Sequence, residues 1–231
     1  MNGDLKYKIQ HDFDRIALLN PQRWEHNNHY HSFLLSQLPI KGKTALEIGC
    51  GTGEFSRLLA QRFERVVAID LSPKMIEVAQ QHSQDFDNID FQVADILQWQ
   101  FPKEKLDAIA SIATFHHLPL ENLLPSLKSA LKPEGKLVIL DLIEYTYPKD
   151  IAIDIISVAF NWMFQILKNR NSKLTKDEIQ AWREHSLTDK YLTLTEATKA
   201  YQKFLKKTTI RKHLFWRYSI VWQKSLSTLT E

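Results

Sequence analysis

A glycine-rich segment, EIGCGTG at residues 47–53, carries the strongest chemical signal in the sequence. It follows an apolar run and precedes a stretch with helical spacing, so it is expected in the turn between a strand and a helix. Glycines in such a turn let backbone N–H groups approach a ligand closely at the start of a helix. The segment therefore predicts a ligand-binding turn.

The spacing of these glycines argues against a dinucleotide as the ligand. The nicotinamide-cofactor fingerprint is G-x-G-x-x-G or G-x-G-x-x-A. Its third small residue would fall on Glu54 if counted from Gly49, and on Ser56 if counted from Gly51. A carboxylate at position 54 would also repel a pyrophosphate. The turn favours a ligand with a cationic centre and no phosphate.

Two aspartates end the next two expected strands. Asp70 follows Gly49 by 21 positions, where a carboxylate can accept hydrogen bonds from both hydroxyls of a ribose. Ser72 already precedes Pro73 as a helix cap, so capping does not account for Asp70. Asp95 ends the following strand, where an acceptor can take the exocyclic amine of an adenine. Alone it would be an ordinary loop acid, but its register with Gly49 and Asp70 favours a ligand role.

Apolar runs alternate with helical spacings along the middle of the chain, which is typical of a parallel sheet covered on both faces. Strands are expected at 44–50, 65–70, 89–95, 106–113, 136–143, 208–214 and 218–224. Helices are expected at 21–38, 54–64, 73–83, 121–132, 151–168, 175–186 and 194–206. The last two strands predict an antiparallel hairpin, and the first 20 residues are expected to form a loose arm.

Five segments occur in the order and spacing of the motifs of class I S-adenosylmethionine-dependent methyltransferases: ALEIGCGTG, VVAIDLS, FQVADI, LDAIASIATFHHL and LKPEGKLVILD. Over about residues 40–145 the chain resembles the small-molecule members of that family. The resemblance implies an α/β fold: a Rossmann-like, seven-stranded, mostly parallel sheet of order 3-2-1-4-5-7-6, with helices on both faces. An antiparallel C-terminal hairpin and a helical insertion after strand 5 complete it.

The resemblance also assigns roles toward S-adenosyl-L-methionine, which would leave as S-adenosyl-L-homocysteine. The methionine part would be held by the turn residues Glu47, Gly49, Cys50, Gly51 and Gly53. Asp70 would bind the ribose, Leu71 and Met75 would flank the adenine, and Asp95 with Ile96 would read its edge. Ile112 lies where the family contacts cofactor and substrate.

The residues after Ile112 bear on catalysis. Enzymes that methylate base or amide nitrogens often carry Asn/Asp-Pro-Pro-aromatic there, whereas this chain has Ile-Ala-Thr-Phe at 112–115 followed by His116 and His117. His116 is a candidate base toward the acceptor. A structural role, capping or packing under the loop, is the competing interpretation, and it is stronger for His117.

The expected N-terminal helix is rich in histidine, at His26, His29 and His31. At about 100° per residue, His31 lies opposite the other two, and no carboxylate or cysteine completes a ligand shell, so no metal site is predicted. Asn27 and His31 share the apolar face. Asn27 and Tyr30 are candidate substrate contacts, and His31 is a second candidate catalytic residue. A hydrogen-bonded core histidine is an equally good interpretation of His31.

Residues 151–167 are apolar on nearly all sides of an expected helix, apart from a narrow polar stripe. In the insertion after the fifth strand, this helix could wall an apolar acceptor pocket, with Phe160 and Phe164 as substrate contacts. A buried core helix is the equal alternative, and a membrane-dipping surface is the third.

Composition sets the remaining bounds. The chain has 231 residues and one cysteine, Cys50, which fits a reducing compartment, and no apolar run reaches the length of a membrane span. A cytoplasmic protein is expected. Residues 1–148 carry 15 basic against 19 acidic side chains, and residues 149–231 carry 15 against 8. The basic C-terminal part keeps open a nucleic-acid partner, although a solvated face is favoured.

The sequence predicts one methyltransferase domain: a helical cap at 1–39, a cofactor-binding core at 40–145, a substrate lid at 146–206 and a hairpin at 207–231. The expected reaction is direct transfer of the sulfonium methyl group to an O, N or C atom of a mainly apolar small molecule. An RNA or protein methyltransferase and a non-catalytic cofactor-binding regulator are the alternatives. The sequence does not indicate the oligomeric state.

Overall fold

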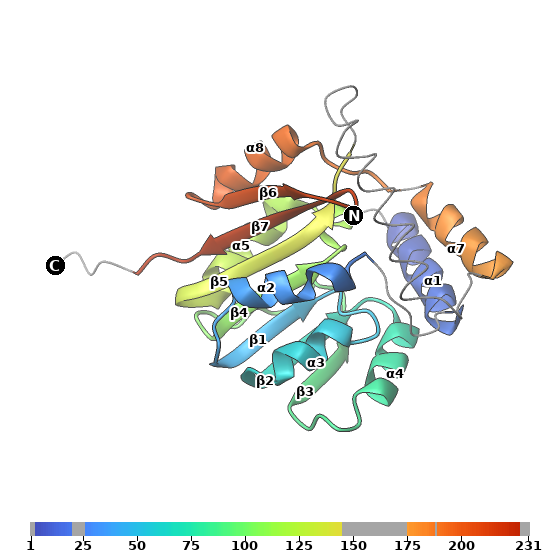
Figure 1. Cartoon of the computed structure of the whole chain (residues 1–231), viewed down its shortest axis with the longest axis horizontal. Helices are drawn as coiled ribbons and strands as arrows, with labels where there is room; N and C mark the ends of the chain where they lie inside the picture. The colour runs from blue at the N-terminus through green and yellow to red at the C-terminus, as the bar shows by residue number, and fades with distance from the viewer. Residues whose placement is uncertain (1–2, 20–25, 145–174, 188, 227–231) are drawn as a thin grey trace.

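The computed structural model describes residues 3–19, 26–144, 175–187 and 189–226. A seven-stranded sheet forms the centre of the molecule, in the order β3-β2-β1-β4-β5-β7-β6 (Figure 1). All pairings are parallel except β5 with β7 and β7 with β6. The predicted strand order and the antiparallel C-terminal hairpin are confirmed.

The strands are β1 (Gly42–Ile48), β2 (Phe63–Asp70), β3 (Ile89–Val93), β4 (Leu106–Ile112), β5 (Leu131–Leu142), β6 (Thr209–His213) and β7 (Arg217–Gln223). The α-helices are α1 (Gly3–Leu19), α2 (His31–Gln37), α3 (Glu54–Ala60), α4 (Pro73–His82), α5 (Leu120–Ala130), α7 (Lys176–Ser186) and α8 (Leu194–Phe204). Two short 3-10 helices, η1 (Asn28–Tyr30) and η2 (Phe115–His117), complete the described elements.

The central strands are buried on both faces because successive side chains point to opposite faces of the sheet and pack into two separate apolar layers. Ala45 of β1 packs in the layer formed with α2 and α3, whereas its neighbour Leu46 packs in the layer formed with α5 and α8. Such two-sided burial requires continuous apolar strands, and this is the pattern from which the sequence predicted a parallel sheet.

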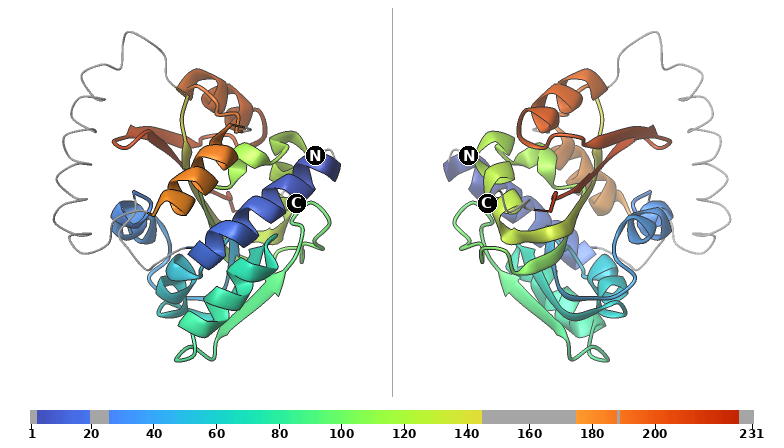
Figure 2. Two further views of the ribbon diagram at one scale, coloured as in Figure 1. Left: turned by 90° about the vertical axis from the view of Figure 1, so that its right-hand side faces the viewer. Right: turned by 90° about the vertical axis from the view of Figure 1, so that its left-hand side faces the viewer.

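The N-terminal segment differs from the expectation of a loose arm, which is wrong: residues 3–19 form the helix α1. Its buried Ile16 and Ala17 pack with Met75 of α4 and Ala181 of α7. The helix lies across the edge of the sheet where the parallel strands end, beside α4 and α7 (Figure 2, left). The helix is stabilised by these tertiary contacts, which cannot be read from the local sequence.

The expected helix from residue 21 is divided. The structure has η1 and then α2, which ends at Gln37. The first residues of the expected helix, 21–25, lie outside the described part of the chain. The expected helix 54–64 ends sooner, at Ala60, because the chain turns there and β2 begins at Phe63.

The predicted helices at 175–186 and 194–206 are confirmed as α7 and α8, each opened by a Thr–Glu capping box. The expected helix 151–168, with Phe160 and Phe164, lies outside the described residues. Within the described residues, no helix is both long enough and apolar enough to cross a bilayer.

Candidate functional site

The glycine turn lies between β1 and α3, and its backbone needs glycine. Gly49, Gly51 and Gly53 all have positive φ, at 70°, 51° and 74°. A Cβ on Gly49 would lie 2.1 Å from Thr114 Oγ1, and one on Gly53 would lie 2.9 Å from the Phe91 ring. A Cβ on Gly51 would meet no protein atom within 4 Å. The space beside Gly51 is therefore where a ligand can approach the backbone.

Glu47 lies below this turn with its side chain buried from solvent. The Ser56 hydroxyl donates a short hydrogen bond to Glu47 Oε2. Burial, opposed by this hydrogen bond, raises the pKa of Glu47 to about 8. The carboxyl group is therefore a buried acceptor that holds its proton near neutral pH unless a cationic group lies beside it.

Asp70 ends β2, and its carboxylate bridges the turn after β1 and the turn after β2. Its Oδ2 accepts the Gly51 N–H at 2.9 Å, and its Oδ1 accepts the Ser72 N–H at 2.9 Å. Burial raises the pKa of Asp70, and the backbone hydrogen bonds from Ser72 and Gly51 oppose the rise. As predicted, Ser72 itself caps α4 by accepting the Met75 N–H.

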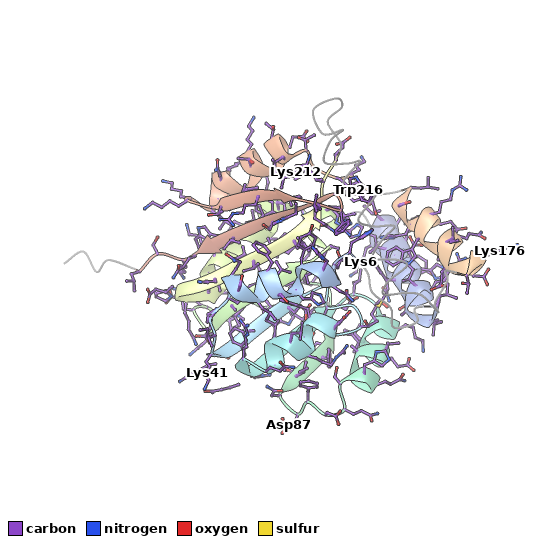
Figure 3. All side chains as sticks on the ribbon, in the orientation of Figure 1. Lys6, Lys41, Asp87, Lys176, Lys212 and Trp216 are labelled. Carbon is purple, nitrogen blue, oxygen red and sulfur yellow. The ribbon has the colours of Figure 1, made fainter. Side chains whose placement is uncertain are left out.

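Asp95 follows β3, one strand further along the same sheet edge. Its Oδ1 accepts the Leu97 N–H at 2.9 Å, and its Oδ2 lies 2.8 Å from Lys6 Nζ of α1. Figure 3 shows Lys6 on the side of the sheet occupied by α1, away from Lys41. Helix α1 therefore covers the acidic group that the sequence assigns to the adenine.

The apolar residues assigned to the cofactor lie along the same edge of the sheet as these acids. Met75, Ile96 and Cys50 are buried, whereas Leu71 and Ile112 are partly exposed. All of them stand at or just beyond the carboxyl ends of β1 to β4, where ligands bind in open α/β sheets.

His116 lies at the next strand ends and has a carboxylate partner. Its Nδ1 is 2.6 Å from Oδ1 of Asp141, a fully buried residue of β5. The preceding Ala113 has a φ of 51°, and this turn brings Thr114 against Gly49. The structure thus connects the glycine turn directly to the histidine loop.

Four further polar residues form a connected group beside His116, and sequence reasoning did not bring them together. His117 Nδ1 and His185 Nε2 each lie 3.7 Å from Asp189 Oδ1. His185 Nδ1 lies 3.2 Å from Asp12 Oδ2 of α1. Burial and the neighbouring His116 and His185 lower the pKa of His117 to about 2. Only the adjacent pair at 116–117 was a visible signal, because the other members are distant in sequence.

The N-terminal candidates contact protein groups. Asn27 Oδ1 accepts the Arg217 Nε–H at 3.0 Å, and the Tyr30 hydroxyl donates to the Leu214 carbonyl at 2.8 Å. His31 is 9% exposed and packs against the Phe55 ring, and burial lowers its pKa to about 4. His31 is therefore neutral at physiological pH. The substrate and catalytic roles of these three residues stay predictions.

Comparison with known proteins agrees with this geometry. Residues 45–135 match the sequence model of a family described as a methyltransferase domain. The ubiquinone biosynthesis O-methyltransferase of Coxiella burnetii is 30% identical over 124 residues, which cover 53% of this chain and 50% of that protein. The trans-aconitate 2-methyltransferase of Escherichia coli is 38% identical over 110 residues, 46% of this chain and 42% of that protein. The matches therefore span half or less of these relatives.

Solved structures share the fold over most of the chain. Phosphoethanolamine N-methyltransferase 1 of Haemonchus contortus, solved with phosphoethanolamine and S-adenosylhomocysteine, has a TM-score of 0.67 at 15% identity. The similarity covers 100% of this chain and 51% of that one. A geranyl diphosphate methyltransferase, solved with its diphosphate and sinefungin, has a TM-score of 0.64 at 12% identity, with 95% and 99% coverage.

Proposed function

We propose that the protein is an S-adenosylmethionine-dependent methyltransferase acting on a small molecule, because residues 45–135 match the methyltransferase domain family and the sheet has the strand order expected for class I. Its product from the cofactor would be S-adenosylhomocysteine. The residues that support this proposal are Gly51, Asp70 and Asp95, which follow one another along the carboxyl ends of β1, β2 and β3.

The observation that carries the proposal is the open space at Gly51 beside the half-buried Asp70. Asp70 borders this space, and its two carboxylate oxygens accept the Gly51 and Ser72 N–H groups. Glu47, below the turn, offers an acceptor to a cationic ligand. A sulfonium nucleoside with an amino-acid tail has the matching groups: a ribose for Asp70, an adenine for Asp95 and a positive charge above Glu47.

The transfer itself needs mainly alignment. The sulfonium charge already activates the methyl group, so the protein contributes by holding donor and acceptor in line and by excluding water. Helix α1, beside α4 and α7, covers the edge of the sheet at which this would occur. The O-methyltransferases among the relatives support an oxygen acceptor on a small molecule.

A binding experiment tests the cofactor. Asp70→Ala should weaken S-adenosylhomocysteine binding by about 10- to 150-fold, because a hydrogen bond to a charged acceptor contributes about 1.5–3 kcal/mol. Asp70→Asn, which keeps the side-chain shape, should show a smaller loss. Asp90→Ala is the matched control, since Asp90 lies on the neighbouring β3 and pairs with the exposed Arg65. Equal calorimetric affinities for the wild type and Asp70→Ala would remove Asp70 from the site.

A transfer experiment tests the activity. The full chain, labelled methyl donor and a panel of hydroxylated, amino and carboxylic small molecules should yield labelled product from one chemical class. Tight cofactor binding with no transfer to small molecules, RNA or protein would instead support the regulator alternative.

A further inference from the structure

The group around His116 holds two buried polar atoms without a partner among the described residues. They are His117 Nε2 and Asp141 Oδ2. The side chain of His117 is 10% exposed and that of Asp141 is 1% exposed. A buried polar atom without a hydrogen bond costs about 1–3 kcal/mol, and an ion or ordered water is a frequent explanation.

The spacing of the surrounding atoms is wider than hydrogen bonding and close to that of metal ligands. Asp189 Oδ1 is 3.7 Å from His117 Nδ1, beyond the range of about 2.7–3.2 Å for a hydrogen bond. Donor atoms of His116, His117 and Asp189 all lie within 4.8 Å of one another. Ligands about 2.0–2.2 Å from one tetrahedral ion are separated by about 3.3–3.6 Å, so the three side chains would close by up to about 1.5 Å around the ion.

The outer contacts also have the pattern of a metal site. A metal-bound histidine usually gives its other ring nitrogen to a carboxylate, and ligating carboxylates are themselves hydrogen-bonded. Asp141 Oδ1 lies 2.6 Å from His116 Nδ1 and accepts its N–H. The Nε2 atom of His116 then carries the lone pair that can bind a metal ion. The Tyr191 hydroxyl donates to Asp189 Oδ2 at 2.7 Å, which leaves Oδ1 for the ion.

We propose that His116, His117 and Asp189 bind one divalent transition metal ion, through one ring nitrogen of each histidine and one carboxylate oxygen. Two imidazoles and a carboxylate suit Zn²⁺ and its neighbours such as Co²⁺. His185, held by Asp12 and 3.7 Å from the same Asp189 oxygen, belongs to the outer layer. Because His116 and His117 precede α5 and Asp189 follows α7, the ion joins the core to the segment that follows β5.

Three protein ligands leave a tetrahedral ion one open position, as in catalytic zinc sites. Resting on the proposed function, we assign this position to a hydroxyl oxygen of the acceptor. Such an ion would lower the pKa of a bound hydroxyl, whose proton would leave to water. The oxygen would then form a bond to the sulfonium methyl carbon, and the carbon–sulfur electron pair would stay on sulfur. His116 acts as a metal ligand in this arrangement and not as a free base.

Metal binding is measured on the whole chain without any methyl-transfer assay. Protein dialysed against EDTA is titrated with Co²⁺, followed by its visible absorption, and with Zn²⁺, followed by calorimetry. One ion per chain should bind with an affinity of about 1 µM or tighter, with the absorption of a low-coordinate nitrogen–oxygen site. Asp189→Ala and His117→Ala should weaken binding at least tenfold, and Asp141→Asn by about 10–100-fold.

Two histidine variants are the matched controls. His82→Ala on α4 and His11→Ala on α1, both exposed residues outside the group, should bind as the wild type does. Circular dichroism and S-adenosylhomocysteine binding check the fold, and Asp189→Asn and His117→Gln replace any variant that unfolds. Absence of stoichiometric Co²⁺ and Zn²⁺ binding, or equal binding by the Asp189 variants, overturns the proposal. A chain that binds the ion but transfers no methyl group contradicts only the proposed function.

Discussion

At the scale of single residues, the three glycines of the turn serve different purposes. Gly49 and Gly53 make room for the side chains of Thr114 and Phe91, whereas Gly51 borders open space. Positive φ disfavours other residues at all three positions. Substitutions should therefore separate a role in folding from a role in ligand binding.

We expect Gly51→Ala to fold and to lose most of its affinity for S-adenosylhomocysteine, because its methyl group occupies ligand space and contacts no protein atom. The left-handed backbone should cost about 1–2 kcal/mol of stability. Gly49→Ala should lose considerably more stability, since it also overlaps Thr114. Thermal unfolding and calorimetry measure both effects. A folded Gly51→Ala protein with unchanged affinity would place the cofactor elsewhere.

Glu47 provides a prediction about pH. Its ordinary pKa is 4.5 and its folded value is about 8, so between these pH values the folded state binds more protons than the unfolded state. Stability must then fall as pH rises through this window. Glu47→Gln, which carries no charge, should lack this slope, which amounts to at most about 1.4 kcal/mol per pH unit.

Urea unfolding of ligand-free protein at several pH values from 5.5 to 8.5 is the measurement. The variant should gain stability relative to the wild type as pH rises. Glu77→Gln is the control, because Glu77 is exposed and pairs with Lys74. Parallel pH profiles for wild type and Glu47→Gln would show that Glu47 is ionised throughout.

The residues that the sequence predicted for the cofactor share a property that made them predictable. Gly51, Asp70 and Asp95 each follow an apolar run directly, so their position at a strand end is a local feature. The group of His117, His185 and Asp189 has no such local mark. It forms only because α7 packs against α1 at the edge of the sheet, a contact between distant segments.

At the scale of elements, the helix α1 shows both what was missed and why. Ile9, Phe13, Ile16 and Ala17 recur with helical spacing, a signal present in the sequence. These apolar residues are few among polar neighbours, and the sequence therefore predicted a loose arm. The contacts with α4 and α7 stabilise the segment as a helix. Strands β1, β2, β4 and β5 were predictable because burial on both faces makes them continuously apolar.

Asp14 joins α1 to the start of α4. Its Oδ1 accepts the Ser72 hydroxyl at 2.6 Å and the Lys74 N–H at 3.1 Å. Asp14→Ala should lower stability by about 1 kcal/mol, as loss of a helix cap does, and should loosen α1 over Asp95. We expect faster proteolysis within α1 and weaker cofactor binding.

Limited proteolysis with mass spectrometry locates the first cleavage. Asp4→Ala, an exposed position at the start of the same helix, is the matched control and should be cut at the wild-type rate. Unchanged proteolysis of Asp14→Ala would mean that the apolar contacts with Met75 and Ala181 alone hold α1.

At the scale of the whole molecule, the charge is divided between the two parts of the chain. Basic side chains gather on α8, on β6 and on the connection between them, at Lys203, Lys206, Lys207, Arg211 and Lys212. Lys203 pairs with Glu121 of α5, and Figure 3 shows Lys212 at the opposite side of the ribbon from Asp87. This basic group lies on α8, on β6 and on the connection between them, whereas the proposed cofactor groups lie at the ends of β1 to β3.

This separation leads to the last prediction. For a small acceptor, reversing the charge of the exposed Lys206 and Lys207 to glutamate should change neither the rate of methyl transfer nor its dependence on salt. A nucleic-acid substrate would give the opposite result, because each lost phosphate contact weakens binding and lowers the salt slope by about one. Lys41→Glu, at the amino end of β1, is the control for a change of net charge alone. A collapse of activity in the double variant but not in Lys41→Glu would exclude the small-molecule assignment in favour of RNA.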